Sequence, residues 1–336
     1  MKKFLKTKIN KLEKLFCLFI IVLLEIGIII SLYTSLKNEG GLTVYEVIYQ
    51  IKSNNSILIY ELKPNWEQKF YGYEIRLPNI TTIKINSDGF RDREFSIEKP
   101  NNTFRIICLG DSFTFGQGVE LNESYPKVLE RKLNSLNNGV KYEVLNFGVP
   151  GYNTWQEVEM LDVKGLKYSP DMVIFGYVHN DIVNTTLINE ILEKTWKEHE
   201  DELNRLSPEK QKIKRVEISD SLLPLFASFE NKNYDEIIEI LKPSAEKLTN
   251  KTKEKSIKII ITNVAIFTPE THLRALKNIS LENGWYMTDN VFSSVTAPDT
   301  LSLYPKKDPH PNPFAHELIA NGIFNYLIKN NIIKVM

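Results

Sequence analysis

Residues 105–112 read Arg-Ile-Ile-Cys-Leu-Gly-Asp-Ser, an apolar run that leads into a turn and a serine. An uninterrupted apolar run of this length is typical of a parallel strand that is buried on both faces. Open parallel sheets bind their ligands at the carboxyl ends of the strands. The sequence therefore predicts a buried strand over 105–109 and places Ser112 at the ligand-binding edge.

Further strand-like runs follow this one, and helix signals separate them. Strands are expected over 142–146, 172–178 and 256–263. Helices are expected from Ser124, from near Thr154 and over 314–329; the last is preceded by Asn312, a good N-cap. Strands that alternate with helices predict an α/β protein with a parallel sheet and right-handed crossovers.

Four short motifs carry groups that suit ester chemistry. In chain order they are Gly110-Asp111-Ser112, Asn146-Phe147-Gly148-Val149-Pro150-Gly151, Asn180-Asp181 and Asp308-Pro309-His310. A nucleophilic serine needs a histidine to take its proton and a carboxylate to orient that histidine, and the oxyanion that forms needs several donors. Ser112, His310 and Asp308 can fill the first three roles. The N–H groups of Ser112 and Gly151 and the Asn180 amide can hold the oxyanion.

These motifs, in this order, resemble those of the SGNH (GDSL-type) esterases and acylhydrolases, from roughly Phe104 to the C-terminus. The resemblance implies a three-layer α/β/α, flavodoxin-like fold with a central parallel sheet, oxyanion roles for Gly151 and Asn180, and no cofactor. One motif departs from the family pattern, because Asp308 and His310 are separated by one residue instead of two. The shorter spacing also occurs in relatives that transfer acetyl groups to polysaccharides.

The other histidines are less suited to the role of general base. His199 and His272 lie in charged runs that are typical of solvated helix faces. His316 falls within the last expected helix, where it can pack or cap. His179 precedes Asn180 directly, so it either supports the turn or touches the acyl pocket. His310 is therefore the expected base.

A metal site is not expected. Asp111, His179, Asp181 and His310 could be imagined around one ion, but the chain has no His-Glu-x-x-His motif, no close His pair and no Cys cluster. We expect Asp111 and Asp181 to bond the backbone of their own turns instead. No phosphate-binding glycine loop is present, and the balance of 42 basic against 42 acidic residues argues against a nucleic-acid partner.

The N-terminus predicts a membrane anchor. Residues 15–33 are apolar apart from Glu25. Fourteen Leu, Ile, Val or Phe residues at roughly −0.3 to −0.6 kcal/mol each outweigh one carboxylate at roughly +2.5 to +3.5 kcal/mol. A cleaved signal peptide is the alternative, but its apolar core is usually about 7–15 residues and no Ala-x-Ala site follows. We expect a transmembrane helix over 15–35, in which Glu25 is either tolerated or paired with an unknown membrane partner.

The lysines set the expected topology and domain order. Six lysines lie within residues 1–14, which predicts a cytoplasmic basic tail and a catalytic domain outside the cell or in the periplasm. Residues 36–100 are expected as a juxtamembrane add-on segment and residues 101–336 as the hydrolase domain. A charged helical insertion is expected over 187–255, either as a lid or as an exposed hairpin.

The predicted function is a membrane-anchored, extracytoplasmic serine esterase that acts through an acyl-enzyme. Its substrate would be a small-molecule or glycan ester with a short acyl group. Two alternatives stay open. The same Ser, His and Asp site could serve a polysaccharide O-acetyltransferase, with aromatic residues such as Trp66, Tyr152 and Trp155 lining an acceptor groove. The chain could also be a non-catalytic glycan-binding or assembly protein.

Overall fold

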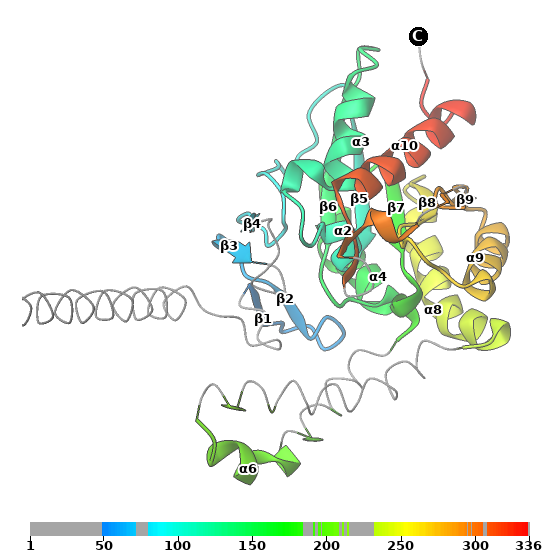
Figure 1. Ribbon diagram of the computed structural model, residues 1–336. Coiled ribbons are helices and arrows are strands. Elements are labelled where there is room, and N and C mark those ends of the chain that lie inside the picture. The colour runs from blue at the N-terminus through cyan, green and yellow to red at the C-terminus, as the bar shows by residue number, and fades with distance from the viewer. Residues whose placement is uncertain are drawn as a thin grey trace, which may run out of the picture. The chain divides into compact units, whose positions relative to one another are not determined.

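A parallel sheet forms the centre of this computed structural model, which describes residues 49–71, 80–183, 191, 194–195, 197–207, 210–211, 214, 232–293, 295–296, 298–304 and 308–334. Within these residues the sheet has five strands (Figure 1), in the spatial order β6 (Lys141–Gly148), β5 (Thr103–Gly110), β7 (Met172–Tyr177), β8 (Lys258–Asn263) and β9 (Tyr286–Met287). Numbered along the chain, this order is 2-1-3-4-5, which is the flavodoxin-like order. The expected fold is confirmed.

Burial explains why these segments are strands. All six residues of β7 are buried, as are the last six of β5 and the last seven of β6. The first buried residue of β5, Arg105, carries a charge. Its register partner on β6 is Glu143, and Arg105 Nη2 lies 2.7 Å from Glu143 Oε2. A buried charge in a central strand is tolerated here because the neighbouring strand supplies its counterion.

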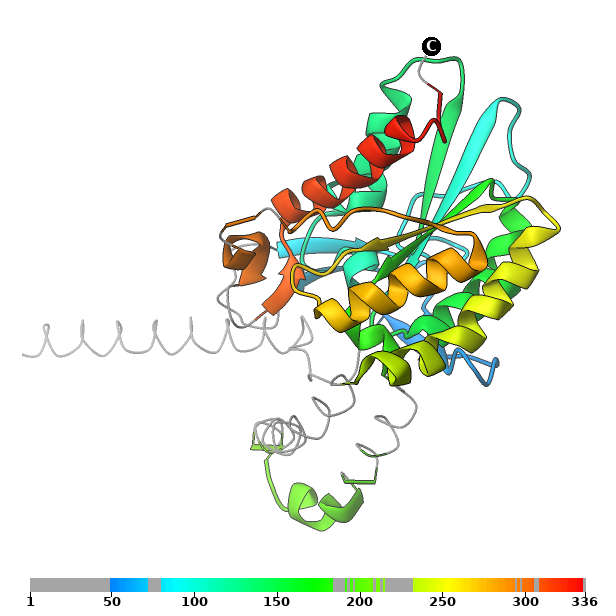
Figure 2. The same ribbon diagram turned by 90° about the vertical axis from the view of Figure 1, so that its right-hand side faces the viewer.

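Helices cover both faces of the sheet (Figure 2). The helices α3 (Tyr125–Asn134) and α10 (Pro313–Lys329) pack together and share one core with alternate residues of β5 and β7. The opposite face carries α4 (Thr154–Val163), α8 (Tyr234–Lys253) and α9 (Glu270–Asn283), which also contact one another. The described part of the chain is therefore a three-layer α/β/α unit, as expected.

The expected insertion contributes one helix to this layered unit. Ile237, Leu241 and Leu248 of α8 are buried, so this helix is part of the layer that covers the sheet. The short helix α6 (Glu200–Asn204) also falls in the expected insertion. Residues 184–190 and 215–231 lie outside the described residues.

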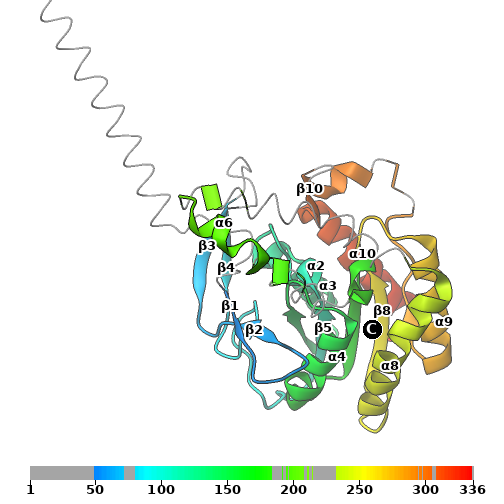
Figure 3. The same cartoon turned by 90° about the horizontal axis from the view of Figure 1, so that it is seen from below.

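Two hairpins precede the central sheet. β1 (Gln50–Lys52) pairs with β2 (Tyr60–Leu62), and β3 (Glu67–Tyr71) pairs with β4 (Ile80–Lys84), both antiparallel. The first hairpin lies beside α4 (Figure 3), where Gln156 Nε2 donates to Leu58 O at 3.0 Å. The segment before the sheet is thus attached to the helical layer by side-chain hydrogen bonds.

The expected membrane helix over 15–35 lies outside the described residues. Among the helices that are described, none combines the length and the apolar composition that a membrane crossing requires. The described residues belong to one contact unit, Ile48–Met336.

Candidate active site

The strand β5 delivers Ser112 to the carboxyl edge of the sheet. Asp111 caps the four-residue helix α2 (Ser112–Phe115), and its Oδ1 accepts the Phe113 N–H at 2.9 Å. Gly116 ends the helix in the left-handed conformation, with φ of 82°. Asp111 therefore bonds the backbone of its own turn, as predicted, and Ser112 occupies the first helical position, where its N–H has no partner within the helix.

His310 reaches Ser112 from the other end of the chain. Its Nε2 lies 2.8 Å from Ser112 Oγ, whereas Asp111 Oδ2 lies 3.4 Å from the same oxygen. At this distance a neutral His310 with an unprotonated Nε2 can accept the serine proton. The Phe113 ring, 4.9 Å from the imidazole between centroids, packs against it. The structure thus brings together the predicted nucleophile and the predicted base.

The segment that carries His310 is a strand, whereas the sequence predicts a loop. β11 (Asp308–Pro311) pairs with β10 (Ser302–Tyr304), and Asp308 is the register partner of Tyr304. The sequence does not predict this strand, because Asp308, Pro309 and Pro311 are typical of turns. Its partner β10 is only three residues long, so it gives no strand pattern of its own. The Asp308 side chain lies outside what the structure describes, so its role as the orienting carboxylate stays a prediction.

Asn180 and Ser112 both contact the Asp111 carboxylate. It sits in the 3-10 turn η3 (His179–Ile182), which follows β7 directly. Asn180 Nδ2 donates to Asp111 Oδ2 at 3.3 Å, and Asp181 Oδ2 accepts the Val178 N–H at 2.8 Å. Asp181 therefore bonds its own turn as predicted, while the Asn180 amide is directed toward the nucleophile's turn. The site forms between the first and third strands, which is the switch point of a 2-1-3-4-5 sheet.

Gly151 occupies a tight turn after β6. Its φ is +81°, and a Cβ added there would meet the Tyr60 hydroxyl oxygen at 2.7 Å. Both facts require glycine at this position. In the part of the chain that the structure describes, neither the Gly151 N–H nor the Ser112 N–H has an intramolecular acceptor. Both groups are available as donors to a ligand.

A buried arginine that sequence reasoning missed supports the nucleophile's helix. The Arg91 side chain donates to the backbone oxygens of Phe115, Gly116, Val119 and Thr82. The adjacent Asp92 pairs with Lys127 at 2.9 Å and accepts the Asn146 N–H. The sequence shows these two residues only as part of a polar turn run, 86–93. Nothing local signals that the pair is buried.

Three carboxyl groups near the site are buried. Burial raises the pKa values of Asp111, Asp181 and Glu157. Neighbouring carboxylates raise the pKa values of Asp181 and Glu157 further, whereas the Phe113 N–H, His310 and the Asn180 amide oppose the increase at Asp111. Neither Glu157 oxygen has a hydrogen-bond partner among the described residues. Glu157 and Asp181 are therefore held toward their neutral forms, so the site carries less negative charge than the sequence suggests.

The remaining histidines are distributed differently from the expectation. His272 is 1% exposed and its Nδ1 lies 2.6 Å from the Tyr177 hydroxyl, so its assignment to a solvated face is wrong. The charged neighbours in sequence occupy other sides of α9. The His179 ring lies edge-on to His272 at 6.3 Å between centroids. His316 is fully buried and its Nδ1 accepts the Tyr125 N–H at 3.2 Å, which agrees with a packing role.

The buried His316 predicts a measurable pH dependence of stability. Burial lowers its pKa to about 3, below the value of about 6.5 in an unfolded chain. The unfolded state then binds the extra proton, so stability is complete above pH 6.5 and is lost as the pH falls toward 3. His316→Asn keeps an acceptor for Tyr125 and removes the titration. Between pH 7 and pH 5, we expect the wild-type free energy of unfolding to fall about 2 kcal/mol more than that of the variant. Chemical denaturation at both pH values measures this difference; equal losses would contradict the prediction.

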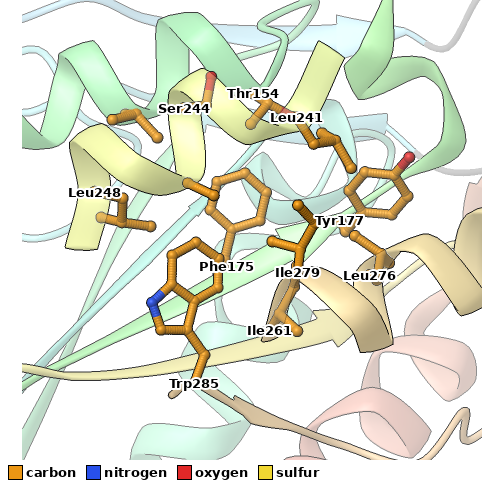
Figure 4. Close-up of a pocket in the computed structure, with 12 residues that line it drawn as sticks. Thr154, Phe175, Tyr177, Leu241, Ser244, Leu248, Ile261, Leu276, Ile279 and Trp285 are labelled. Atoms are coloured by element: carbon orange, nitrogen blue, oxygen red, sulfur yellow. The ribbon is translucent and has the colours of Figure 1, made fainter. Parts of the chain in front are cut away.

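No group of side chains in the described residues could hold a metal ion. The described surface does contain a small pocket between α4, α8, α9 and the sheet, shown in Figure 4. Its lining is mostly apolar, with Phe175, Ile261 and Trp285 among its members, and it includes no acidic, basic or cysteine side chain. None of the predicted catalytic or oxyanion residues lines this pocket.

One family model and several solved structures are similar to this chain. A family model described as GDSL-like Lipase/Acylhydrolase matches residues 106–323. A solved lipase/acylhydrolase from Enterococcus faecalis is similar at 14% identity, covering 69% of this chain and 98% of its own, with a TM-score of 0.44. The psychrotrophic esterase EstA from Pseudoalteromonas sp. is similar at 15% identity, covering 69% and 100%, with a TM-score of 0.43. No protein of curated function matches the chain.

Proposed function

Because the chain belongs to the GDSL-like lipase/acylhydrolase family, we propose that it is a serine esterase in which Ser112 attacks an ester carbonyl. The observation that carries this proposal is the 2.8 Å contact between Ser112 Oγ and His310 Nε2. A histidine at this distance can remove the serine proton as the new bond forms. A non-catalytic binding role does not explain why residues 198 positions apart make this contact.

The proposed reaction has two halves. In the first, His310 takes the Ser112 proton, the oxyanion forms, and the leaving alcohol departs with that proton. In the second, His310 takes a proton from water as the water oxygen attacks the acyl-enzyme. The bond between the acyl carbon and Ser112 Oγ then breaks, and His310 returns the proton to Ser112 Oγ as the acid leaves. Asp308 would orient His310. The N–H groups of Ser112 and Gly151 and the Asn180 amide would stabilise the oxyanion in both halves.

The oxyanion role of Asn180 predicts a loss of turnover. Asn180→Ala removes an amide donor beside Ser112 without touching the nucleophile or the base. We expect kcat on p-nitrophenyl acetate to fall about 10²–10³-fold, as when one preorganised donor is lost elsewhere. Asn278→Ala, which alters an exposed amide on α9, is the matched control and should keep wild-type kcat. A kcat for Asn180→Ala within about threefold of wild type would remove this residue from the oxyanion hole.

The proposed location is the outer face of the cell membrane, with the N-terminus in the cytoplasm. The apolar stretch 15–33 and the six lysines before it support this proposal. In intact protoplasts or spheroplasts, protease added outside should digest the catalytic domain and spare the basic tail. Protection of the whole chain until the cells are lysed would place the domain in the cytoplasm and reject the proposed topology.

The proposed substrate is a short acyl ester on a small molecule or on an envelope or extracellular glycan. One observation favours a second candidate, acetyl transfer to a polysaccharide, namely the one-residue spacing between Asp308 and His310. The two reactions differ only in whether water or a sugar hydroxyl attacks the acyl-enzyme. With p-nitrophenyl acetate as donor and xylo- or chito-oligosaccharides present, an esterase should form acetate equal to the p-nitrophenol released. Acetylated sugar as the main product would establish the transferase.

A further inference from the structure

The turn that presents Gly151 has a defined type. The Tyr152 N–H donates to Val149 O at 3.1 Å, which closes a four-residue turn with Pro150 and Gly151 at its centre. Proline at the second position and glycine with φ of +81° at the third define a type II turn. Types I and II differ chiefly in the direction of the central peptide group. The direction of the Gly151 N–H therefore depends on whether the turn is of type I or type II.

Two side chains from the first hairpin bind this central peptide. The Tyr60 hydroxyl donates to Pro150 O at 2.9 Å, and Gln50 Nε2 donates to the same oxygen at 3.2 Å. In a trans peptide the C=O and N–H groups point in opposite directions. Two donors on Pro150 O therefore fix the direction of the Gly151 N–H. They also polarise the peptide and make that N–H a stronger donor.

Tyr60 is held in place by several contacts. The preceding residue, Ile59, has φ of +65°, a conformation that β-branched residues rarely adopt and that stores on the order of 1–3 kcal/mol. The Tyr60 ring packs on the Tyr152 ring at 5.2 Å between centroids, and the Tyr152 hydroxyl donates to Tyr60 O at 2.5 Å. The hydroxyl of Tyr60 fills the space that a Cβ of Gly151 would need. Strain concentrated beside a fixed tyrosine is typical of a functional position.

We propose that Tyr60 and Gln50 are positioning residues for the oxyanion hole. They hold the Pro150–Gly151 peptide in its type II orientation, so that the Gly151 N–H faces the oxyanion formed on Ser112. Both residues precede the segment that the family model matches, 106–323. The hairpin β1–β2 is thus part of the catalytic apparatus. This inference rests on the proposed esterase function, in which Gly151 is an oxyanion donor.

Kinetics of the full-length chain test the proposal with p-nitrophenyl acetate. Tyr60→Phe keeps the ring contact with Tyr152 and removes the hydroxyl. We expect kcat to fall about tenfold with KM unchanged, which is less than the roughly 10²–10³-fold loss of a whole donor. The double variant Tyr60→Phe/Gln50→Leu should lose more than either single variant. The control is Lys164→Met, which removes a 2.6 Å ion pair between Glu61 of the same hairpin and Lys164 but no bond to Pro150. It should keep wild-type kcat.

A second measurement needs no activity. In a crystal structure of the double variant, we expect the Gly151 φ to move from +81° toward the value of about −90° that a type I turn requires. If wild-type protein hydrolyses no ester, the proposed function fails, and the φ of Gly151 still decides whether the two side chains set the turn. The proposal is overturned if Gly151 stays at +81°, or if the turn flips while kcat remains at the level of Lys164→Met.

Discussion

Ser112→Ala is expected to lose at least about 10⁴-fold of the wild-type kcat, and His310→Ala is expected to lose a similar amount. The reason is the single hydrogen bond of 2.8 Å that joins the two side chains. Without His310 the serine keeps its proton and is a weak nucleophile, and without Ser112 no acyl-enzyme can form. Since the two act as one unit, the double variant should fall no further than either single variant.

Controls separate chemistry from folding in this test. His316→Asn alters a buried histidine that faces α3 and should retain turnover at pH 7, since His316 does not contact Ser112. The thermal midpoints of Ser112→Ala and His310→Ala should stay near that of the wild type. Additive losses in the double variant would show that the two residues act in separate steps, and would contradict the proposed pair.

Arg91→Met is expected to lower the free energy of unfolding by about 3–5 kcal/mol, because it removes a buried charged donor from several backbone carbonyls. The guanidinium donates to Val119 O at 2.7 Å and to Gly116 O at 2.5 Å, and it makes longer bonds to the backbone oxygens of Phe115 and Thr82. Burial lowers its pKa to about 10, so the group is still charged at neutral pH. Methionine fills the volume but removes the donor of Val119 O and leaves Gly116 O with only the Val119 N–H at 3.3 Å.

Two matched variants make the Arg91 result interpretable. Arg91→Lys keeps the charge but lacks the planar fork, so it should recover only part of the loss. Arg93→Met removes a half-exposed arginine that pairs with Glu130 at 3.3 Å, and it should change stability by less than about 1 kcal/mol. Urea denaturation of all three variants measures the differences. Equal stability of Arg91→Met and Arg93→Met would show that the buried bonds contribute little.

The central strands could be predicted because burial on both faces leaves a signal in each segment by itself. The runs around Ile107 and Ile174 are apolar throughout, and each ends in a motif that the parallel sheet brings to one edge. The order of the motifs and the position of His310 before the last helix followed from the same local patterns. The contact between Ser112 and His310 was therefore predictable from the sequence.

Features that depend on distant partners could not be predicted. β9 is two residues long, and β11 is a strand only because β10 pairs with it. Arg91 lies in a polar run, and nothing in that run indicates that its side chain is buried. The backbone carbonyls that it binds lie 24 or more residues downstream, in the segment that follows Ser112. His272 was misassigned because its charged sequence neighbours say nothing about the side of α9 that faces Tyr177. The Asp308 role and the membrane anchor stay predictions.

The most direct test is to expose the full-length protein to a fluorophosphonate and to locate the adduct by intact mass and peptide mapping. We predict one adduct, on Ser112, which is absent from Ser112→Ala and forms far more slowly in His310→Ala. Labelling of a different serine, or no labelling of folded wild-type protein, would contradict the proposal that Ser112 is an activated nucleophile.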